Sequence, residues 1–368
     1  MKLNIKKITA IVLSAAMALG LSACGGSGRA TGGNEADSTA AVTDNAAGTG
    51  DQAADGGDQA GLKKITFCLD WTPNTNHTGI YAAKALGYYE EAGLDVEIVQ
   101  PPENGATTMC ASGQAQFAVD AQDTMAAAID ENESHESLGI TAVAALIQHN
   151  TSGILSRKGD GIDRPKGLEG RTYSTWEIPT ELAMIEQVIT ADGGDFSKVK
   201  MIPNDITDEP AALAAKQTDA VWVFYGWSGI NAGIEGVPVD YWSFAEISPE
   251  LDYYTPVLVA NNDFLAKDPD TARAFLAATR KGYEYAVSNP KEAADYLIEG
   301  DETGSLKGSE DLVYASQEWL SEKYIDDAPA WGQIDPARWD AFYSWLYDNK
   351  LTSTDLTGKG YSNDYLPQ

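Results

Sequence analysis

From Lys63 onward, short apolar runs alternate with segments in which apolar positions recur at helical spacing. Residues 64–70 form the first apolar run, and the helix pattern after it ends at Gly87, a residue type that readily adopts the left-handed conformation at helix ends. Residues 94–100 then alternate between apolar and polar positions, as in a strand. Strand and helix patterns in alternation are typical of an α/β fold with a mostly parallel sheet.

The same alternation continues along the chain. It predicts helices at 106–113 and 123–131, strands at 116–120, 139–148 and 171–175, and a helix with Pro179 in its first turn. Segment 209–227 repeats the plan of 106–123, which indicates two similar lobes. The C-terminal part is predicted to be helical at 270–289, 290–299, 309–324 and 336–349.

The first two dozen residues have the pattern of a bacterial lipoprotein signal. A lysine-rich start precedes an apolar stretch at 8–20 that is too short to cross a bilayer. It ends in Leu-Ser-Ala-Cys, which resembles the lipobox, where the peptide is cut before the cysteine and the cysteine is acylated. We therefore expect residues 1–24 to be a signal peptide, Cys24 to carry lipid, and the protein to be anchored on the outer face of the cell membrane. The alternative is an ordinary secretion signal with an incidental cysteine.

Residues 25–62 are rich in Gly, Ala, Ser, Thr, Asp and Gln and contain no aromatic residue. Such a segment buries too little apolar surface to offset its chain entropy, so we expect a disordered tether.

The chain has a formal net charge of −30, with acidic residues spread along its whole length. This charge disfavours binding to nucleic acid and to anionic lipid headgroups. Cys68 and Cys110 remain after lipidation, and the sequence leaves open whether they pair. The three histidines are too scattered for a zinc site, and we expect neither a metal nor a cofactor.

Polar and aromatic residues follow several of the predicted strands. In open α/β sheets, ligands bind beyond the carboxyl ends of the strands, so these segments are the candidate cleft. The candidate ligand-binding residues are Asp70, Trp71, Asn74, His77, Tyr81, Asp120, Gln122, Trp176, Glu177, Glu181, Tyr225 and Trp227. Two of them have structural alternatives, since His77 opens a helix and Glu181 lies where a helix dipole favours an acid.

These segments contain no lysine or arginine, although pockets for phosphate, sulfonate or carboxylate usually include one. Aromatic rings can instead sandwich a flat heterocycle, and carboxylates accept hydrogen bonds from its amino groups. The residues therefore fit an amino-substituted pyrimidine, and they also fit a cationic amine.

The strand and helix layout resembles the two-lobed periplasmic solute-binding proteins. Segments 69–98, 112–120, 168–185 and 220–232 resemble the THI5/NMT1-like group of ABC-transporter substrate-binding proteins, and most of all its formylaminopyrimidine binders. The resemblance implies a type II-like binding-protein fold with a ligand cleft between two lobes. Residues 63–153 and 257–368 would form the first lobe and 154–256 the second. It also implies a monomer that delivers its ligand to an ABC permease and its ATPase.

The resemblance leaves other functions open. The superfamily includes riboflavin, sulfonate and nitrate binders, and a surface sensor or adhesion module without a transporter is a further alternative. The family also includes a pyrimidine synthase with a lysine that holds pyridoxal phosphate and a cysteine-rich motif. Here residues 119–124 read Val-Asp-Ala-Gln-Asp-Thr and 253–256 read Tyr-Tyr-Thr-Pro, so both features are missing and an enzyme is not expected.

Overall fold

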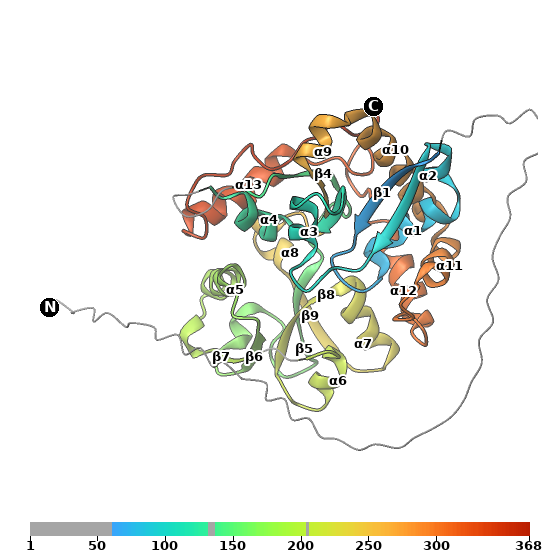
Figure 1. Cartoon of the computed structure of the whole chain (residues 1–368). Coiled ribbons are helices and arrows are strands. Elements are labelled where there is room, and N and C mark those ends of the chain that lie inside the picture. The colour runs from blue at the N-terminus through green and yellow to red at the C-terminus, as the bar shows by residue number, and fades with distance from the viewer. Residues whose placement is uncertain (1–60, 132–136, 204–205) are drawn as a thin grey trace, which may run out of the picture. The chain divides into compact units, whose positions relative to one another are not determined.

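The computed structural model describes residues 61–131, 137–203 and 206–368 (Figure 1). The predicted signal peptide, Cys24 and nearly all of the predicted tether lie outside these residues.

Two five-stranded sheets form the framework of the described chain. The first has the order β2-β1-β3-β10-β4 and the second the order β7-β6-β8-β5-β9. The strands of the first sheet are β1 (Lys63–Cys68), β2 (Leu94–Val99), β3 (Phe117–Asp120), β4 (Ile140–Ala145) and β10 (Val257–Asn261). Those of the second are β5 (Ser152–Arg157), β6 (Thr172–Thr175), β7 (Lys200–Pro203), β8 (Ala220–Phe224) and β9 (Val239–Ser243).

Both sheets are mixed, which refines the prediction of mostly parallel sheets. In each sheet four strands run in one direction, while β10 or β5 runs against both of its neighbours. The two reversed strands are those that follow a crossing between the sheets, at 146–151 and 252–256. The chain crosses where the other strands end, so the next strand starts at that edge and runs the opposite way.

Helices cover the sheets at the predicted places, with small shifts at their ends. The helix predicted to end at Gly87 is α1, which ends at Ala85, and a short helix, α2, follows the left-handed Gly87. The helix predicted at 123–131 spans Gln122–Ile129. The α-helices are α1 (Thr78–Ala85), α2 (Tyr88–Glu91), α3 (Ala106–Ala111), α4 (Gln122–Ile129), α5 (Pro179–Ala191), α6 (Glu209–Ala214), α7 (Ile230–Ile234), α8 (Phe244–Ile247), α9 (Asn262–Lys267), α10 (Pro269–Ser288), α11 (Pro290–Gly300), α12 (Glu310–Ser321) and α13 (Pro336–Asp348). Short turns are η1 (Thr75–His77), η2 (Pro165–Leu168), η3 (Phe196–Lys198), η5 (Pro249–Leu251) and the π-helical η4 (Tyr225–Gly229).

The first sheet carries a layer of helices on each face (Figure 1). Helices α1, α2 and α10 to α12 contribute to one apolar core, in which Phe275 of α10 stacks on Phe117 of β3 with ring centroids 4.0 Å apart. On the other face, α3, α4 and α13 share a core in which Phe342 stacks on Tyr253 at 4.2 Å. The C-terminal helices therefore complete the lobe that the first strands begin.

Two glycines bring α1 and α10 into close contact. A Cβ added at Gly282 would lie 2.0 Å from the carbonyl oxygen of Gly79, and one added at Gly79 would lie 2.3 Å from the ring of Tyr283. Because α1 begins directly after residues 70–77, this contact also fixes where that loop lies.

Within the described ranges, no helix is both long and apolar enough to cross a bilayer.

Candidate functional site

A cavity of about 280 Å³ lies where strands of both sheets end. Asp70 follows β1, Asp120 ends β3 and Phe224 ends β8, while Thr255 and Pro256 precede the reversed strand β10. The cavity is lined by Asp70, Asn76, Gly105, Ala106, Thr107, Val119, Asp120, Ala121, Thr124, Phe224, Thr255 and Pro256. We refer to it as the interlobe pocket.

The loop at 70–77 is built around a buried histidine. His77 is fully buried, its Nδ1 accepts a hydrogen bond from the backbone N–H of Asn74 at 3.2 Å, and its Nε2 lies 2.8 Å from Oδ1 of Asp70. Since Nδ1 accepts, the ring proton is on Nε2 and is donated to Asp70. Both ring nitrogens are therefore used within the loop, and His77 positions Asp70.

Asn74 has a similar structural role. Its side chain accepts from the N–H of Asn76 at 2.9 Å and donates to the carbonyl oxygen of Thr72 at 3.1 Å. The amide of Asn76 instead lines the interlobe pocket, and it makes no hydrogen bond to the described part of the chain. Asn76 is thus the amide of this loop that is free to meet a ligand.

Side chains from the C-terminal helices hold the same loop. The hydroxyl of Tyr283 donates to the carbonyl oxygen of Asn76 at 2.6 Å, and that of Tyr324 donates to the carbonyl oxygen of Thr75. The hydroxyl of Thr75 lies 2.6 Å from that of Ser316. The loop is therefore fixed from α10, α12 and the segment after α12.

Asp120 is the buried carboxyl group of the pocket. Only 6% of its surface is exposed, and it accepts hydrogen bonds from the hydroxyl of Thr107 at 2.6 Å and the N–H of Ala121 at 2.8 Å. Burial, with smaller contributions from the charges of Asp123 and Asp70, raises the pKa of Asp120 to about 7. None of the described residues that line the pocket is a lysine, arginine or histidine.

Exposed aromatic rings lie at strand ends of both sheets. Trp71 follows Asp70 and is 69% exposed, Trp176 follows β6 and is 47% exposed, and Phe224 in the pocket is 42% exposed. Large apolar side chains left in water at one site commonly mark a binding surface. Of these three rings, that of Phe224 lines the pocket together with Asp70 and Asp120.

Glu181 positions one of these rings. It is 4% exposed and accepts hydrogen bonds from the hydroxyl of Tyr173 at 2.6 Å, the hydroxyl of Thr175 at 3.0 Å and the N–H of Trp176 at 3.1 Å. Its carboxylate is thus occupied by protein donors. Glu177 is exposed and has a left-handed φ of 58°, which turns the chain between β6 and α5.

Two other predicted residues lie away from the pocket. Tyr81 is 6% exposed and lines a separate cavity of about 380 Å³ with residues of α11. Gln122 is fully buried, donates to the carbonyl oxygen of Trp339 at 2.8 Å and accepts from the N–H of Tyr254 at 3.1 Å. The structure therefore places neither with Asp70 and Asp120, and Gln122 joins α4 to the C-terminal helices.

Tyr225 and Trp227 also point away. Tyr225 lies between Tyr241 and Trp319, at centroid distances of 4.9 and 5.3 Å, and lines a cavity of about 720 Å³ beside the crossing segments. Trp227 packs against the core of the first sheet. The π-helical turn that begins at Tyr225 separates these rings from the pocket, so Phe224 is the ring that reaches it.

Thr107 was not among the predicted site residues, although it lines the pocket and binds Asp120. It occupies the first turn of α3, beyond the carboxyl end of β2. The helix reads Ala-Thr-Thr-Met-Cys-Ala, so the sequence offers two adjacent hydroxyls and does not indicate which of them faces the pocket.

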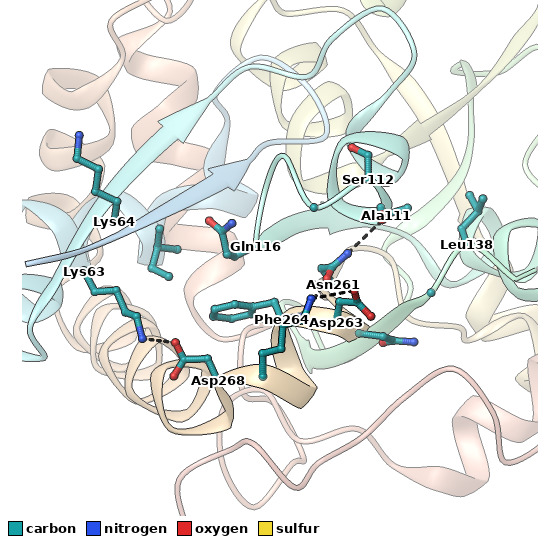
Figure 2. A pocket seen from close by; sticks show the side chains of 15 residues that line it. Lys63, Lys64, Ala111, Ser112, Gln116, Leu138, Asn261, Asp263, Phe264 and Asp268 are labelled. Atoms are coloured by element: carbon teal, nitrogen blue, oxygen red, sulfur yellow. Dashed lines mark hydrogen bonds and ion pairs between the residues drawn. The ribbon is translucent and has the colours of Figure 1, made fainter.

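A larger hollow of about 610 Å³ lies at the opposite edge of the first sheet, where β1 starts and β10 ends (Figure 2). It contains none of the predicted site residues. Figure 2 shows Lys63 paired with Asp268 beside it, and Lys267 lies 3.1 Å from Asp263. Its charged groups are thus largely paired with one another.

The described residues contain no cluster of His, Cys, Asp and Glu that could hold a metal ion. Cys68 and Cys110 are free, buried thiols, which answers the question of their pairing. Burial, with a smaller contribution from Asp70, raises the pKa of Cys68 to about 11.

Two mixed sheets joined by two crossings, with a pocket at their facing strand ends, define the two-lobed periplasmic binding-protein fold. The nitrate-binding protein NrtA from Synechocystis PCC 6803 has this fold, with a TM-score of 0.61 at 13% identity, over 83% of this chain and 87% of that one. The alkanesulfonate-binding protein SsuA from Xanthomonas axonopodis pv. citri superposes with a TM-score of 0.57 at 11% identity, over 82% and 99%.

The chain belongs to the NMT1/THI5-like family, whose model matches residues 74–293. It is 27% identical over 291 residues to the formylaminopyrimidine-binding protein of Halalkalibacterium halodurans, covering 77% of this chain and 85% of that protein. It is 26% identical over 261 residues to the 4-amino-5-hydroxymethyl-2-methylpyrimidine phosphate synthase THI5 of Saccharomyces cerevisiae, covering 62% and 69%. Fold and family together support a solute-binding role.

Proposed function

We propose that this protein is the extracytoplasmic solute-binding component of an ABC importer and that it captures an amino-substituted pyrimidine that serves as a thiamine precursor. Formylaminopyrimidine and 4-amino-5-hydroxymethyl-2-methylpyrimidine are the candidate ligands. The observation that carries the proposal is the interlobe pocket, which combines Asp70, Asp120, the amide of Asn76 and the ring of Phe224, with no basic side chain among the described residues that line it. The relative named for formylaminopyrimidine binding supports the choice of ligand.

The chemistry of the pocket suits this ligand class. Carboxylates accept hydrogen bonds from an exocyclic amino group, an amide can both donate to and accept from ring substituents, and an aromatic ring stacks on a flat heterocycle. A sulfonate or a nitrate would face Asp70 and Asp120 with no lysine or arginine among the lining residues. The pocket therefore favours a neutral or cationic solute.

The volume of the pocket also favours a small ligand such as a pyrimidine. A volume of about 280 Å³ is just below the lower end of the range usual for small-molecule sites, roughly 300–1,000 Å³. A single pyrimidine ring with small substituents fits this space, whereas the three fused rings and ribityl chain of riboflavin need considerably more.

A binding role is also favoured over synthase activity. The resemblance to the synthase implies a lysine near the end of β3, and this strand ends at Asp120. A carboxylate cannot form a Schiff base with pyridoxal phosphate, so this strand end supports binding and not covalent catalysis.

Phe224→Ala tests the pocket directly, with Tyr347→Ala as its control. The two rings are similarly exposed, at 42% and 45%, and Tyr347 lies on α13. We expect both amino-pyrimidines to raise the melting temperature of the wild-type protein, and a ligand at about one hundred times its dissociation constant to stabilise it by about 2.7 kcal/mol. Phe224→Ala should weaken binding, and Tyr347→Ala should not. If riboflavin, an alkanesulfonate or nitrate stabilised the protein and neither pyrimidine did, the proposed pyrimidine ligand would be rejected.

We further propose that Cys24 carries the lipid anchor and that the protein delivers its ligand as a monomer to a permease with an ATPase. The lipobox-like sequence supports the anchor. Replacing Cys24 with Ala should release the protein from the membrane fraction, and unchanged anchoring would contradict the assignment.

A further inference from the structure

The surroundings of Asp120 favour its neutral form. It is almost completely buried, and it accepts two hydrogen bonds from the described residues. The carboxyl groups of Asp123 and Asp70 both act to raise its pKa, and burial raises the pKa of Asp123 as well. The remaining titratable groups around it are the thiol of Cys110 and the phenol of Tyr343, and neither supplies positive charge. His77, the remaining ionisable group of the adjacent loop, donates its Nε2 proton to Asp70.

A neutral carboxylic acid has a defined partner on an amino-pyrimidine. The acid presents one O–H donor and one carbonyl acceptor side by side. The edge of the pyrimidine that carries the amino group presents a ring nitrogen, which accepts, next to an N–H, which donates. The two edges are complementary and form a pair of parallel hydrogen bonds, an arrangement that adds geometric specificity.

We propose that Asp120 reads the amidine edge of the pyrimidine and that the complex holds one proton between the Asp120 carboxyl group and the ring nitrogen. This proposal rests on the proposed function, since it concerns the same pocket and the same ligand class. The proton can lie on the carboxyl oxygen or on the ring nitrogen, and both forms contain the same number of protons. Asp70, which accepts from His77, would retain its second oxygen for the far hydrogen of the amino group.

The proposal makes ligand capture depend on pH. Since the pKa of Asp120 is raised to about 7, the free protein already carries the proton below this pH and must take it from water above it. The affinity should therefore be nearly constant from about pH 6 to 7 and should fall by about tenfold per pH unit well above pH 7. An anion-binding pocket would show no such requirement for an added proton at this carboxyl group.

The test is titration calorimetry of the full chain with 4-amino-5-hydroxymethyl-2-methylpyrimidine, in pairs of buffers that differ in their heat of ionisation. Proton uptake per ligand bound should rise from near zero at about pH 6 to near one at about pH 8.5. Asp120→Asn retains a donor and an acceptor but cannot titrate, so it should bind with no uptake and with a nearly flat pH profile. Asp263→Asn is the control, because Asp263 lies at the opposite edge of the first sheet and is not among the carboxyl groups that raise the pKa of Asp120, so it should retain the uptake curve.

The possible outcomes separate the two proposals. Pyrimidine binding without proton uptake by the wild-type protein would overturn the role of Asp120 and leave the proposed function standing. Uptake that persists in Asp120→Asn would also overturn it, by assigning the proton to another group. Failure of the wild-type protein to bind the pyrimidine at any pH would refute the proposed function together with this inference. If Asp120→Asn does not fold, the wild-type uptake curve still decides whether a proton is bound.

Discussion

The contact between α1 and α10 is expected to be intolerant of a single methyl group. In Gly282→Ala the new Cβ would lie 2.0 Å from the carbonyl oxygen of Gly79 and 2.8 Å from the Cβ of Ala83. Reaching an ordinary contact distance of 3.4 Å from that oxygen requires a displacement of about 1.4 Å, and the obstacle is backbone that cannot rotate away. Overpacking of this kind costs about 1–3 kcal/mol, and alanine regains up to about 1 kcal/mol in helix propensity.

Gly233→Ala provides the matched control. Gly233 is also helical, within α7, and a Cβ there meets nothing within 4 Å. We expect Gly233→Ala to gain about 0.5–1 kcal/mol and Gly282→Ala to lose about 1–2 kcal/mol, which lowers its melting temperature by roughly 2–8 °C. Thermal and urea unfolding of the two variants measure the difference. Because α1 continues directly from the loop at 70–77, Gly282→Ala should also weaken pyrimidine binding.

Equal stability of the two glycine variants would contradict this reasoning, since it would mean that α1 and α10 separate at no cost. A Gly282→Ala variant that loses stability but binds pyrimidine like the wild type would show instead that the loop is fixed by its hydrogen bonds alone.

Two further predictions concern groups outside the pocket. Glu181→Gln replaces a buried acceptor of several hydrogen bonds, so we expect the free energy of unfolding in urea to fall by about 2 kcal/mol. Ligand binding should weaken as well, because Trp176 would be displaced. Unchanged stability would contradict the positioning role of Glu181. His149 lies 2.7 Å from Asp252 at the crossings, and this hydrogen bond raises its pKa. Its stabilising effect should be complete below about pH 6.5 and lost as pH rises through the folded-state pKa. The melting temperatures of His149→Gln and wild type should therefore differ most in mild acid; a gap that widens with pH would refute this.

The position of the pocket followed from strand pattern alone. Alternating strand and helix patterns set the direction of most strands, and this direction decides which edge of each sheet collects polar residues. Asp70 and Asp120 were predicted on this basis, and the structure brings them into one cavity. The two reversed strands, β5 and β10, do not change the predicted position of the pocket, because they start at the edge where the other strands end.

The sequence did not predict which side chain after strand β8 points into the pocket. The segment after β8 contains Phe224, Tyr225 and Trp227, and sequence reasoning favoured the last two. The π-helical turn decides the outcome, since it directs Tyr225 toward Tyr241 and leaves Phe224 in the pocket. A shift of one residue around this turn changes which ring lines the pocket, and no residue in the segment indicates the shift.

Partners that are distant in sequence account for the remaining differences. The sequence predicts Gln122 as a ligand contact, but its side-chain amide donates to the carbonyl oxygen of Trp339, 217 residues later in the chain. The hydroxyl of Ser316 similarly lies next to that of Thr75, 241 residues away, and donates to the carbonyl oxygen of Gly226. Through this one hydroxyl, α12 connects the loop of the first lobe to the turn after β8 in the second. The interlobe pocket is thus framed by the strand ends, which local pattern reveals, and held in place by C-terminal helices, whose contacts only the folded chain reveals.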